Sequence, residues 1–234
     1  MTRIFLLSLP VFLSFLFSCS GTHNNLDRIG LKGQVKSVKE VECGATYEDD
    51  KWVAGEDCAR VYRMTSYTQD GNYISIMTLD NRNDTLGIAR MRFEDGEMVE
   101  EVYYQKVFLT PKHSKLVKDS RTVMDRVSSD QVNFEVWQND VLRYEGATYF
   151  DSKGRIDKQV EVVNDRETMV YYVYEKDLLV ENYQLELDGG SRIATQLYEY
   201  DDYDDHGNWT TKLVYLGEEK ITPKVVITRT LDYY

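Results

Sequence analysis

Hydrophobic and polar residues alternate in short segments from residue 30 onward, and turn residues separate the segments. The segments are rich in Tyr, Val, Ile, Thr and Phe, which suit the pleated, half-buried surface of a β-strand. Few residues join successive segments, too few for the crossover helix that parallel neighbours require. The pattern therefore predicts antiparallel strands over residues 35–43, 60–67, 73–79, 87–93, 98–108, 132–138, 141–150, 156–163, 169–175, 178–187, 193–200, 208–216 and 225–233.

Residues 115–127 fit two interpretations. Leu116, Val123, Met124 and Val127 could line one face of a helix, and the same stretch equally fits a loop followed by a strand. Apart from this segment and the N-terminal signal, the pattern predicts little helix. We therefore expect one all-β domain over residues 30–234.

A recurrent turn separates several of the predicted strands. It places an aromatic or acidic residue first, then Asp, two further residues and Gly, before the next apolar residue. Asp caps such a turn through its own side chain, and Gly takes the positive φ that closes it. The turn occurs at residues 67–73, 92–98, 149–156 and 203–209, with a degenerate copy without glycine at 174–178.

The first nineteen residues carry a different pattern, in which Arg3 precedes an apolar run over residues 4–17. Because a permanent membrane helix needs about 20 residues, the run favours a cleaved signal; an uncleaved anchor or a buried N-terminal helix is the alternative. Leu16, Ser18 and Cys19 resemble the lipobox of bacterial lipoproteins, in which the cysteine takes a diacylglycerol. The resemblance implies a signal peptide over residues 1–18, a lipid on Cys19, and a tether over residues 19–29.

Cys43 and Cys58 remain as a pair once Cys19 is set aside. An exported chain meets an oxidising compartment, so we expect these two thiols to form a disulfide. A metal site is the alternative, but zinc usually takes four ligands and no histidine lies nearby.

The formal net charge is −12, from 40 Asp and Glu against 28 Lys and Arg. Such a chain repels nucleic acid, which we therefore do not expect as a partner. Membrane contact is expected through the lipid anchor instead. Because Ser20, not aspartate, follows Cys19, we expect an outer-membrane lipoprotein, at the periplasmic face or the cell surface.

Residues 31–38, 203–215 and 229–234 resemble the YD, or RHS-like, repeats of secreted bacterial proteins and of small Bacteroidetes lipoproteins. The resemblance implies display at the cell envelope and carries no catalytic residue onto this chain. Gly71, Gly96, Gly154 and Gly207 are separated by 25, 58 and 53 residues, not by a constant period. We therefore expect a single antiparallel, twisted and curved β-meander sheet, not a closed shell.

Enzyme signatures such as a nucleophile elbow or a phosphate loop are not found in the sequence, and His23, His113 and His206 are scattered. We expect no enzyme and no cofactor. Asp202 and Asp204 form part of an acidic turn that suits calcium; a solvated hairpin tip is the alternative.

The aromatic residues offer candidates for ligand binding. Trp137, Trp209 and Tyr172, with its neighbours Tyr171 and Tyr174, could stack on sugar rings. Cross-strand tyrosine ladders that stabilise the sheet are the competing explanation. We expect a lipid-anchored, non-catalytic interaction or scaffold module whose partner is an envelope protein; the alternative is a glycan- or small-ligand-binding accessory lipoprotein.

Overall fold

The computed structural model describes residues 25–59, 61–94, 97–110, 113–185 and 191–234, so the predicted signal peptide and Cys19 lie outside the described residues. A short helix, α1 (Asn25–Arg28), precedes one sheet of fifteen strands. The strands are β1 (Val35–Glu48), β2 (Lys51–Cys58), β3 (Val61–Tyr67), β4 (Tyr73–Asp80), β5 (Thr85–Glu94), β6 (Glu97–Thr110), β7 (His113–Ser128), β8 (Gln131–Gln138), β9 (Val141–Phe150), β10 (Ile156–Val163), β11 (Arg166–Glu175), β12 (Leu178–Leu185), β13 (Arg192–Tyr203), β14 (Trp209–Leu216) and β15 (Val225–Tyr233).

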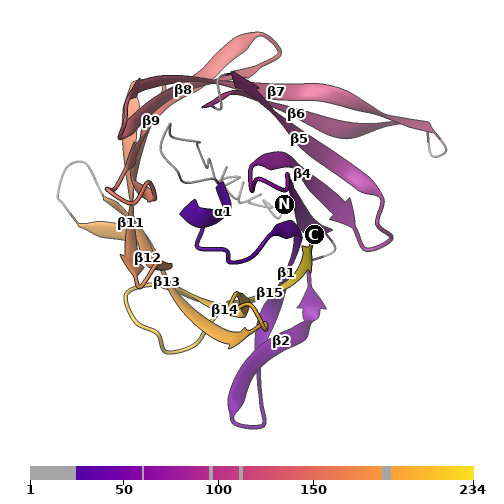
Figure 1. Ribbon diagram of the computed structural model, residues 1–234, viewed down its shortest axis with the longest axis vertical. Helices are drawn as coiled ribbons and strands as arrows, with labels where there is room; N and C mark the ends of the chain where they lie inside the picture. The colour runs from indigo at the N-terminus through magenta and orange to yellow at the C-terminus, as the bar shows by residue number, and fades with distance from the viewer. Residues whose placement is uncertain (1–24, 60, 95–96, 111–112, 186–190) are drawn as a thin grey trace, which may run out of the picture.

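The sheet closes into a barrel because β1 pairs along both of its edges. One edge runs antiparallel to β15 from Val35 to Gly44. The other edge pairs first with β3 and then with β2. Fourteen strands therefore form a closed antiparallel barrel, and β2 is one extra strand outside the ring (Figure 1).

The prediction of a single open, curved sheet is wrong, while the all-β class is confirmed. The turns specify hairpins between neighbours in sequence, but closure joins β1 to β15 at the other end of the domain. Glu40 and Arg229, which meet across this seam, are 189 residues apart. Irregular spacing of the turns does not prevent closure, because antiparallel hairpins of different lengths can follow one another around the same ring.

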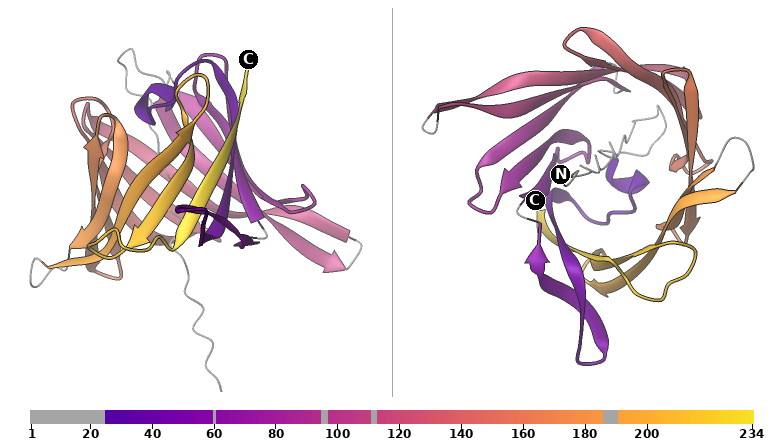
Figure 2. Two further views of the ribbon diagram at one scale, coloured as in Figure 1. Left: turned by 90° about the horizontal axis from the view of Figure 1, so that it is seen from below. Right: turned by 180° about the vertical axis from the view of Figure 1, so that it is seen from behind.

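The ambiguous segment 115–127 is extended and belongs to β7, which pairs with β6 and β8. The β6–β7 hairpin is the longest of the barrel and projects beyond the ring (Figure 2). The apolar residues of segment 115–127 have a spacing that would also suit a helix. The segment is nevertheless a strand, because β7 pairs with β6 along one edge and with β8 along the other.

The predicted Asp-containing turns at residues 67–73, 149–156 and 203–209 lie at one end of the barrel, which we call the α1 end, whereas Asp95 and Gly96 of the turn at 92–98 lie outside the described residues. In the turn from β13 to β14, the Asp204 carboxylate accepts hydrogen bonds from the backbone N–H groups of His206 and Asn208, at 3.0 and 2.8 Å. Gly207 follows with a φ of 76°. Asp151 caps the turn from β9 to β10 in the same way, through N–H groups at 2.9 Å.

The α1 helix lies inside the ring of strands (Figure 1). Leu26 and Leu31 pack there against Val35, Val38 and inward-facing tyrosines of β3 and β4. Leu26, within the segment that the sequence assigned to the tether, is thus packed inside the barrel. Among the described residues, no helix is long and apolar enough to cross a membrane.

A second apolar cluster continues around the inside of the α1 end. It includes Met98, Met124, Val132, Phe134 and Phe150, each 7% exposed or less, from β6 to β9. Both clusters contact Met91 and Phe93 of β5, so together they form one apolar layer across the α1 end. Away from this layer the inward face carries charged and aromatic residues together with aliphatic ones such as Ile76 and Val214.

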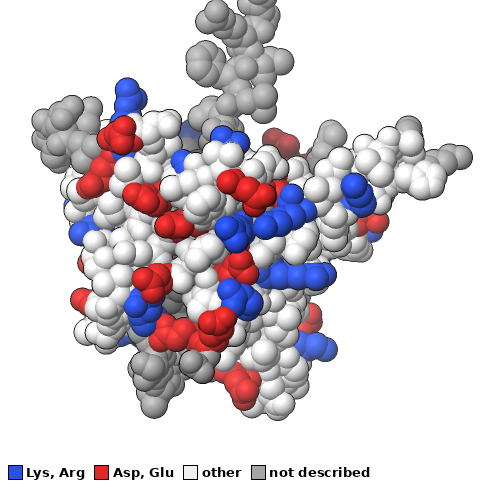
Figure 3. All heavy atoms as spheres, turned by 90° about the horizontal axis from the view of Figure 1, so that it is seen from above, with Lys and Arg blue, Asp and Glu red and all other residues white. Residues whose placement is uncertain are grey.

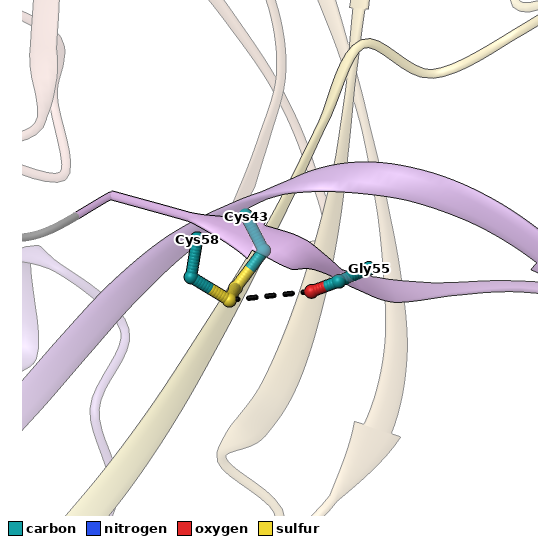
Figure 4. The surroundings of a disulfide bond; sticks show 3 residues. All are labelled: Cys43, Gly55 and Cys58. Atoms are coloured by element: carbon teal, nitrogen blue, oxygen red, sulfur yellow. Dashed lines mark hydrogen bonds between the residues drawn. A yellow bond between two sulfur atoms is a disulfide. The ribbon is translucent and has the colours of Figure 1, made fainter.

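The β1–β2 hairpin is fastened on the outside of the barrel. Trp52 of β2 packs with Leu213, Tyr215 and Val226, which point outward from β14 and β15. The predicted disulfide between Cys43 and Cys58 is confirmed, and it lies beside Gly55 at the base of this hairpin (Figure 4).

Candidate ligand-binding interior

A circular barrel of fourteen strands is wider than one of eight. Fourteen strands about 4.8 Å apart and tilted by about 40° give a backbone cylinder about 28 Å across. The same relation gives about 16 Å for eight strands, the width that side chains just fill. The inside of the barrel, called the lumen below, is therefore the main candidate for a binding site.

The first feature of the lumen is a group of charged residues that we call the cationic wall. It consists of Arg63 on β3, Lys212 on β14 and Arg229 on β15, which surround Glu40 on β1. Glu40 lies two positions from Val38, which packs on α1, so its side chain also points inward. In the strand register Glu40 stands directly between Arg229 and Arg63.

Both arginines bind the Glu40 carboxylate. Arg229 Nη2 donates to Oε1 at 3.1 Å, and Arg63 donates to Oε2 through Nε at 3.2 Å and also through Nη2. Burial raises the pKa of Glu40, but Arg63, Arg229 and Lys212 together more than reverse this and lower the pKa to about 2. Glu40 is therefore ionised at every physiological pH.

The cationic wall is exposed to solvent at Arg63. The inward-facing Arg63 side chain is 45% exposed, whereas the side chains of Glu40 and Arg229 are 13% and 10% exposed. Lys212 is half-buried, and burial, followed by the charges of Arg229 and Arg63, lowers the pKa of Lys212 to about 8 against the opposing effect of Glu40.

Beside this wall lies a group of rings that we call the aromatic arc: Tyr172 and Tyr174 of β11, Tyr198 and Tyr200 of β13, and Trp209 of β14. Tyr200 and Trp209 have ring centroids 5.2 Å apart. The Arg229 guanidinium lies over Trp209, 3.2 Å from the ring centroid. The arc thus begins where the cationic wall ends.

Polar side chains hold the rings of the arc in place. Asn182 Nδ2 donates to Tyr198 Oη at 2.9 Å, and Tyr198 in turn donates to Gln196 at 2.7 Å. The Tyr200 hydroxyl donates to the backbone carbonyl of Leu179 at 2.7 Å. Burial raises the pKa of Tyr198 and Tyr200, so both hydroxyls remain protonated.

On the opposite side of the lumen lie Glu101 of β6 and Glu161 of β10, with Tyr144 of β9, and we call this side the acidic wall. Neither carboxyl group forms an ion pair with a Lys or Arg of the described part of the chain. Glu101 is 7% exposed, and burial raises its pKa to about 7. Burial also raises the pKa of Glu161, against the effect of the Gln159 amide that donates to it at 3.0 Å. Burial, then Glu161 and Glu101, raise the pKa of Tyr144 to about 12.

The structure separates the aromatic residues predicted as ligand candidates. Trp209, Tyr172 and Tyr174 face the lumen, whereas Tyr171 faces outward and stacks on Tyr183 at 5.3 Å. Trp137 also faces outward, because its neighbour Val136 belongs to the inner apolar cluster.

Trp137 lines a shallow outer pocket of about 140 Å³. The Arg121 guanidinium covers the ring from 5.4 Å, and the Trp137 indole N–H donates to Glu135 at 3.0 Å. The pocket is lined by Lys118, Asp119, Arg121, Trp137, Asn139 and Asp140.

The calcium candidates Asp202 and Asp204 have other partners. The Asp204 carboxylate caps its turn and also accepts from Tyr233 Oη, and Asp202 accepts from the Thr211 hydroxyl at 3.4 Å. Within the described ranges, no three His, Cys, Asp or Glu side chains are grouped as a metal ion would require.

Sequence reasoning missed the cationic and acidic walls, although the alternation contains a signal for them. Glu40 shares its strand face with Val38, and Arg229 shares its face with Leu231, both of which pack near α1. A charged residue in phase with the buried positions of its own strand must point inward. That phase is what would have identified both residues.

Comparison with known protein families and with curated proteins finds no match. Among solved structures, the chain is similar to a porin-like protein from Bacteroides vulgatus (15% identity, TM-score 0.48, covering 86% of this chain and 98% of that one) and to a porin-like protein from Bacteroides uniformis (9% identity, TM-score 0.40, covering 86% and 99%). It is also similar to a LolA superfamily protein from Nitrosomonas europaea, with 10% identity, a TM-score of 0.33, and 84% of each chain covered. All three are distant likenesses in shape.

Proposed function

We propose that this protein is an exported, lipid-anchored binding protein that holds a small molecule in the lumen of its barrel and performs no chemistry on it. The observation that carries the proposal is the combination of a ring of fourteen strands with a polar and aromatic inner surface. Ligand sites in proteins combine ring surfaces with a few placed polar groups in this way.

The arrangement of the lumen supports a site with one apolar end. The apolar layer and α1 lie at the α1 end, and the cationic wall and aromatic arc follow them along the strands. A molecule seated beside this layer would lie near the buried Trp209 and contact the half-buried tyrosines of the arc, Tyr172, Tyr174 and Tyr200. The hydrogen bonds that fix Tyr198 and Tyr200 keep these rings in place before a ligand arrives.

The outer surface supports a barrel that stands in water, with the lipid as its attachment to the membrane. Ion pairs join neighbouring strands on the outside, between Arg92 and Glu100 at 3.1 Å and between Arg192 and Glu181 at 2.5 Å. Lysine, arginine, aspartate and glutamate are intermingled on the face that Figure 3 shows. An Arg or Lys facing lipid at mid-membrane costs about 2–4 kcal/mol.

The predicted lipid on Cys19 would also orient the barrel. Asn25 follows Cys19 by six positions, a span of about 20 Å at full extension. This short tether would keep the α1 end near the membrane of the envelope, which we propose is the outer membrane.

A second candidate is protein interaction through the projecting β6–β7 hairpin. Phe108 and Leu109 are 62% and 60% exposed, and Val107 and Leu116 are 40% and 43% exposed. Exposed apolar groups of this kind often mark interaction surfaces. Pull-down of envelope proteins by the wild type, but not by a Phe108→Ser, Leu109→Ser variant, would favour this candidate.

The binding proposal is tested by the response of Trp209, the one tryptophan among three that faces the lumen. Every contact that closes the barrel lies between residues 25 and 234, so a chain that starts at Ser20 keeps them all. Trp52→Phe and Trp137→Phe leave Trp209 as the sole emitter. We expect N-phenylnaphthylamine or its sulfonated analogue, anilinonaphthalene sulfonate, to quench Trp209 by energy transfer in a saturable way. If neither probe quenches Trp209, the proposal is wrong.

A further inference from the structure

The cationic wall has more positive charge than its carboxylate balances. Arg63, Lys212 and Arg229 surround Glu40, and the nearest further carboxylate on this wall is the exposed Glu42. This excess stands in a protein whose net charge is −12. Buried like charges repel, so the free wall lacks a partner that an anion would supply.

Unused hydrogen-bond donors point to the same conclusion. Nε and Nη1 of Arg229 are buried and have no hydrogen-bond partner among the described residues, although the side chain is only 10% exposed. The Lys212 ammonium likewise forms no hydrogen bond or ion pair within the described residues. Its Nζ lies over two rings, 5.1 Å from the centroid of Trp209 and 5.2 Å from that of Tyr198. Buried donors are normally paired, and an unpaired one is costly.

These donors lie beside aromatic surfaces. Trp209 is next to both cations, and Tyr200 adjoins Trp209. An acidic group at Lys212 and Arg229 would therefore bring the remainder of its molecule against the rings of the arc. Carboxylate, sulfonate and phosphate groups all satisfy arginine and lysine donors.

We propose that the cationic wall recognises the acidic group of a small, ring-bearing anion, which Lys212 and Arg229 bind while Tyr200 contacts the ring. This inference rests on the proposed function, because it names the chemical class of the lumenal ligand. In the free protein Glu40 accepts from Arg229 Nη2 and so competes with the anion, while Arg63 binds the other oxygen of Glu40.

The test compares two probes that share one skeleton and differ in charge. Anilinonaphthalene sulfonate is an anion, and N-phenylnaphthylamine is neutral. In the background with Trp209 as the sole tryptophan, we expect the anion to bind about tenfold more tightly than the neutral probe, and its affinity to fall as salt is added.

Two substitutions should move the anion's affinity in opposite directions. Lys212→Met should weaken anilinonaphthalene sulfonate about tenfold and leave N-phenylnaphthylamine unchanged, because it removes a cation and retains an apolar stem. At pH 6, well below the Lys212 pKa of about 8, Glu40→Gln removes the competing carboxylate and should tighten the anion about threefold or more. The matched control is Lys158→Met, which removes a lysine that lies over Tyr149 on the outer face and should change neither affinity.

The outcomes separate this inference from the proposed function. Equal binding of both probes, unaffected by Lys212→Met and Glu40→Gln, would overturn anion recognition and leave a lumenal ligand site standing. Failure of both probes to quench Trp209 would remove both. Because Glu40→Gln predicts a gain, a loss of affinity caused by misfolding in Lys212→Met cannot imitate the full result.

Discussion

The two walls of the lumen each contain an inward-facing glutamate, and the pKa values of these two glutamates are shifted in opposite directions. Glu40 and Glu101 both point inward near the apolar layer of the α1 end, and their exposures are low, 13% for the Glu40 side chain and 7% for Glu101. Burial alone raises the pKa of Glu101 to about 7, while two arginines and Lys212 bring that of Glu40 to about 2. Neighbouring charge, not depth of burial, decides which carboxyl is ionised.

The comparison also shows how one barrel can present two chemical surfaces. At neutral pH Glu40 is ionised between its two arginines, whereas Glu101, with a pKa of about 7, is in the middle of its titration. A ligand in the lumen would meet an ionised arginine–carboxylate cluster on one side and a carboxyl group that exchanges its proton on the other. The predictions below test each half of this contrast.

The largest effect should follow from removing a cation beside Glu40. Arg229→Met leaves a buried carboxylate with one arginine, and we expect the free energy of unfolding to fall by about 3–5 kcal/mol. Chemical denaturation at pH 7 measures it. Arg92→Met, which breaks an exposed outer ion pair with Glu100, is the control and should change stability by about 1 kcal/mol or less. Similar losses of stability in both variants would mean that the Arg229–Glu40 ion pair stabilises the fold no more than an exposed surface ion pair does.

The acidic wall should respond in the opposite sense. A carboxyl whose folded pKa is raised from 4.5 to about 7 destabilises the fold progressively between these two values, and fully above pH 7. Glu101→Gln should therefore be more stable than the wild type by about 3 kcal/mol at pH 8 and equal to it below pH 4.5.

Denaturation of both proteins at pH 4 and pH 8 checks this prediction. Glu145→Gln, at an exposed position of β9, is the matched control and should show no such pH dependence. A wild type that stays as stable as Glu101→Gln at pH 8 would show that Glu101 has a cation near it after all.

Loss of the disulfide should affect the β1 side alone. Cys43 and Cys58 are 15 residues apart, and replacing both by serine should lower the free energy of unfolding by up to about 3 kcal/mol in the chain-entropy model. The pKa of Glu101, followed by NMR, should not move. A shift there would indicate that the two walls are coupled through the barrel.

The smallest effect concerns Lys212. Its pKa of about 8 is supported by the charge of Glu40, so Glu40→Gln should lower it further. Lysine side-chain NMR across pH 6 to 11 follows the titration, with Lys158 as the outer reference. An unchanged or higher pKa in the variant would contradict the proposed arrangement of charges.

Local features of this fold could be predicted from the sequence, and long-range ones could not. The Asp-capped turns at Asp151 and Asp204 formed as predicted, because a side chain that bonds its own turn is a local signal. Strand β2 was missed because glycine and acidic residues interrupt its apolar pattern. Closure was missed because nothing near Glu40 in the sequence indicates that Arg229 is its partner.

The same distinction applies to the candidate site. Trp209 and Tyr172 could be proposed from residue type alone, but residue type gave Trp137 equal weight. Trp209 and Tyr172 differ from Trp137 in the face of the sheet from which their side chains project. That face can be inferred only from which neighbouring positions of the strand are buried. The charged residues of both walls needed this same information.

The seam between β1 and β15 has a consequence for biogenesis. If the chain is exported from its N-terminus, as proposed, β1 crosses the membrane before β15, and the ring cannot close until β15 has followed. Until then β1 offers an unpaired edge, which is prone to aggregation. The nine residues of β15 thus complete the barrel, and a chaperone would have to protect the open sheet before β15 pairs with β1.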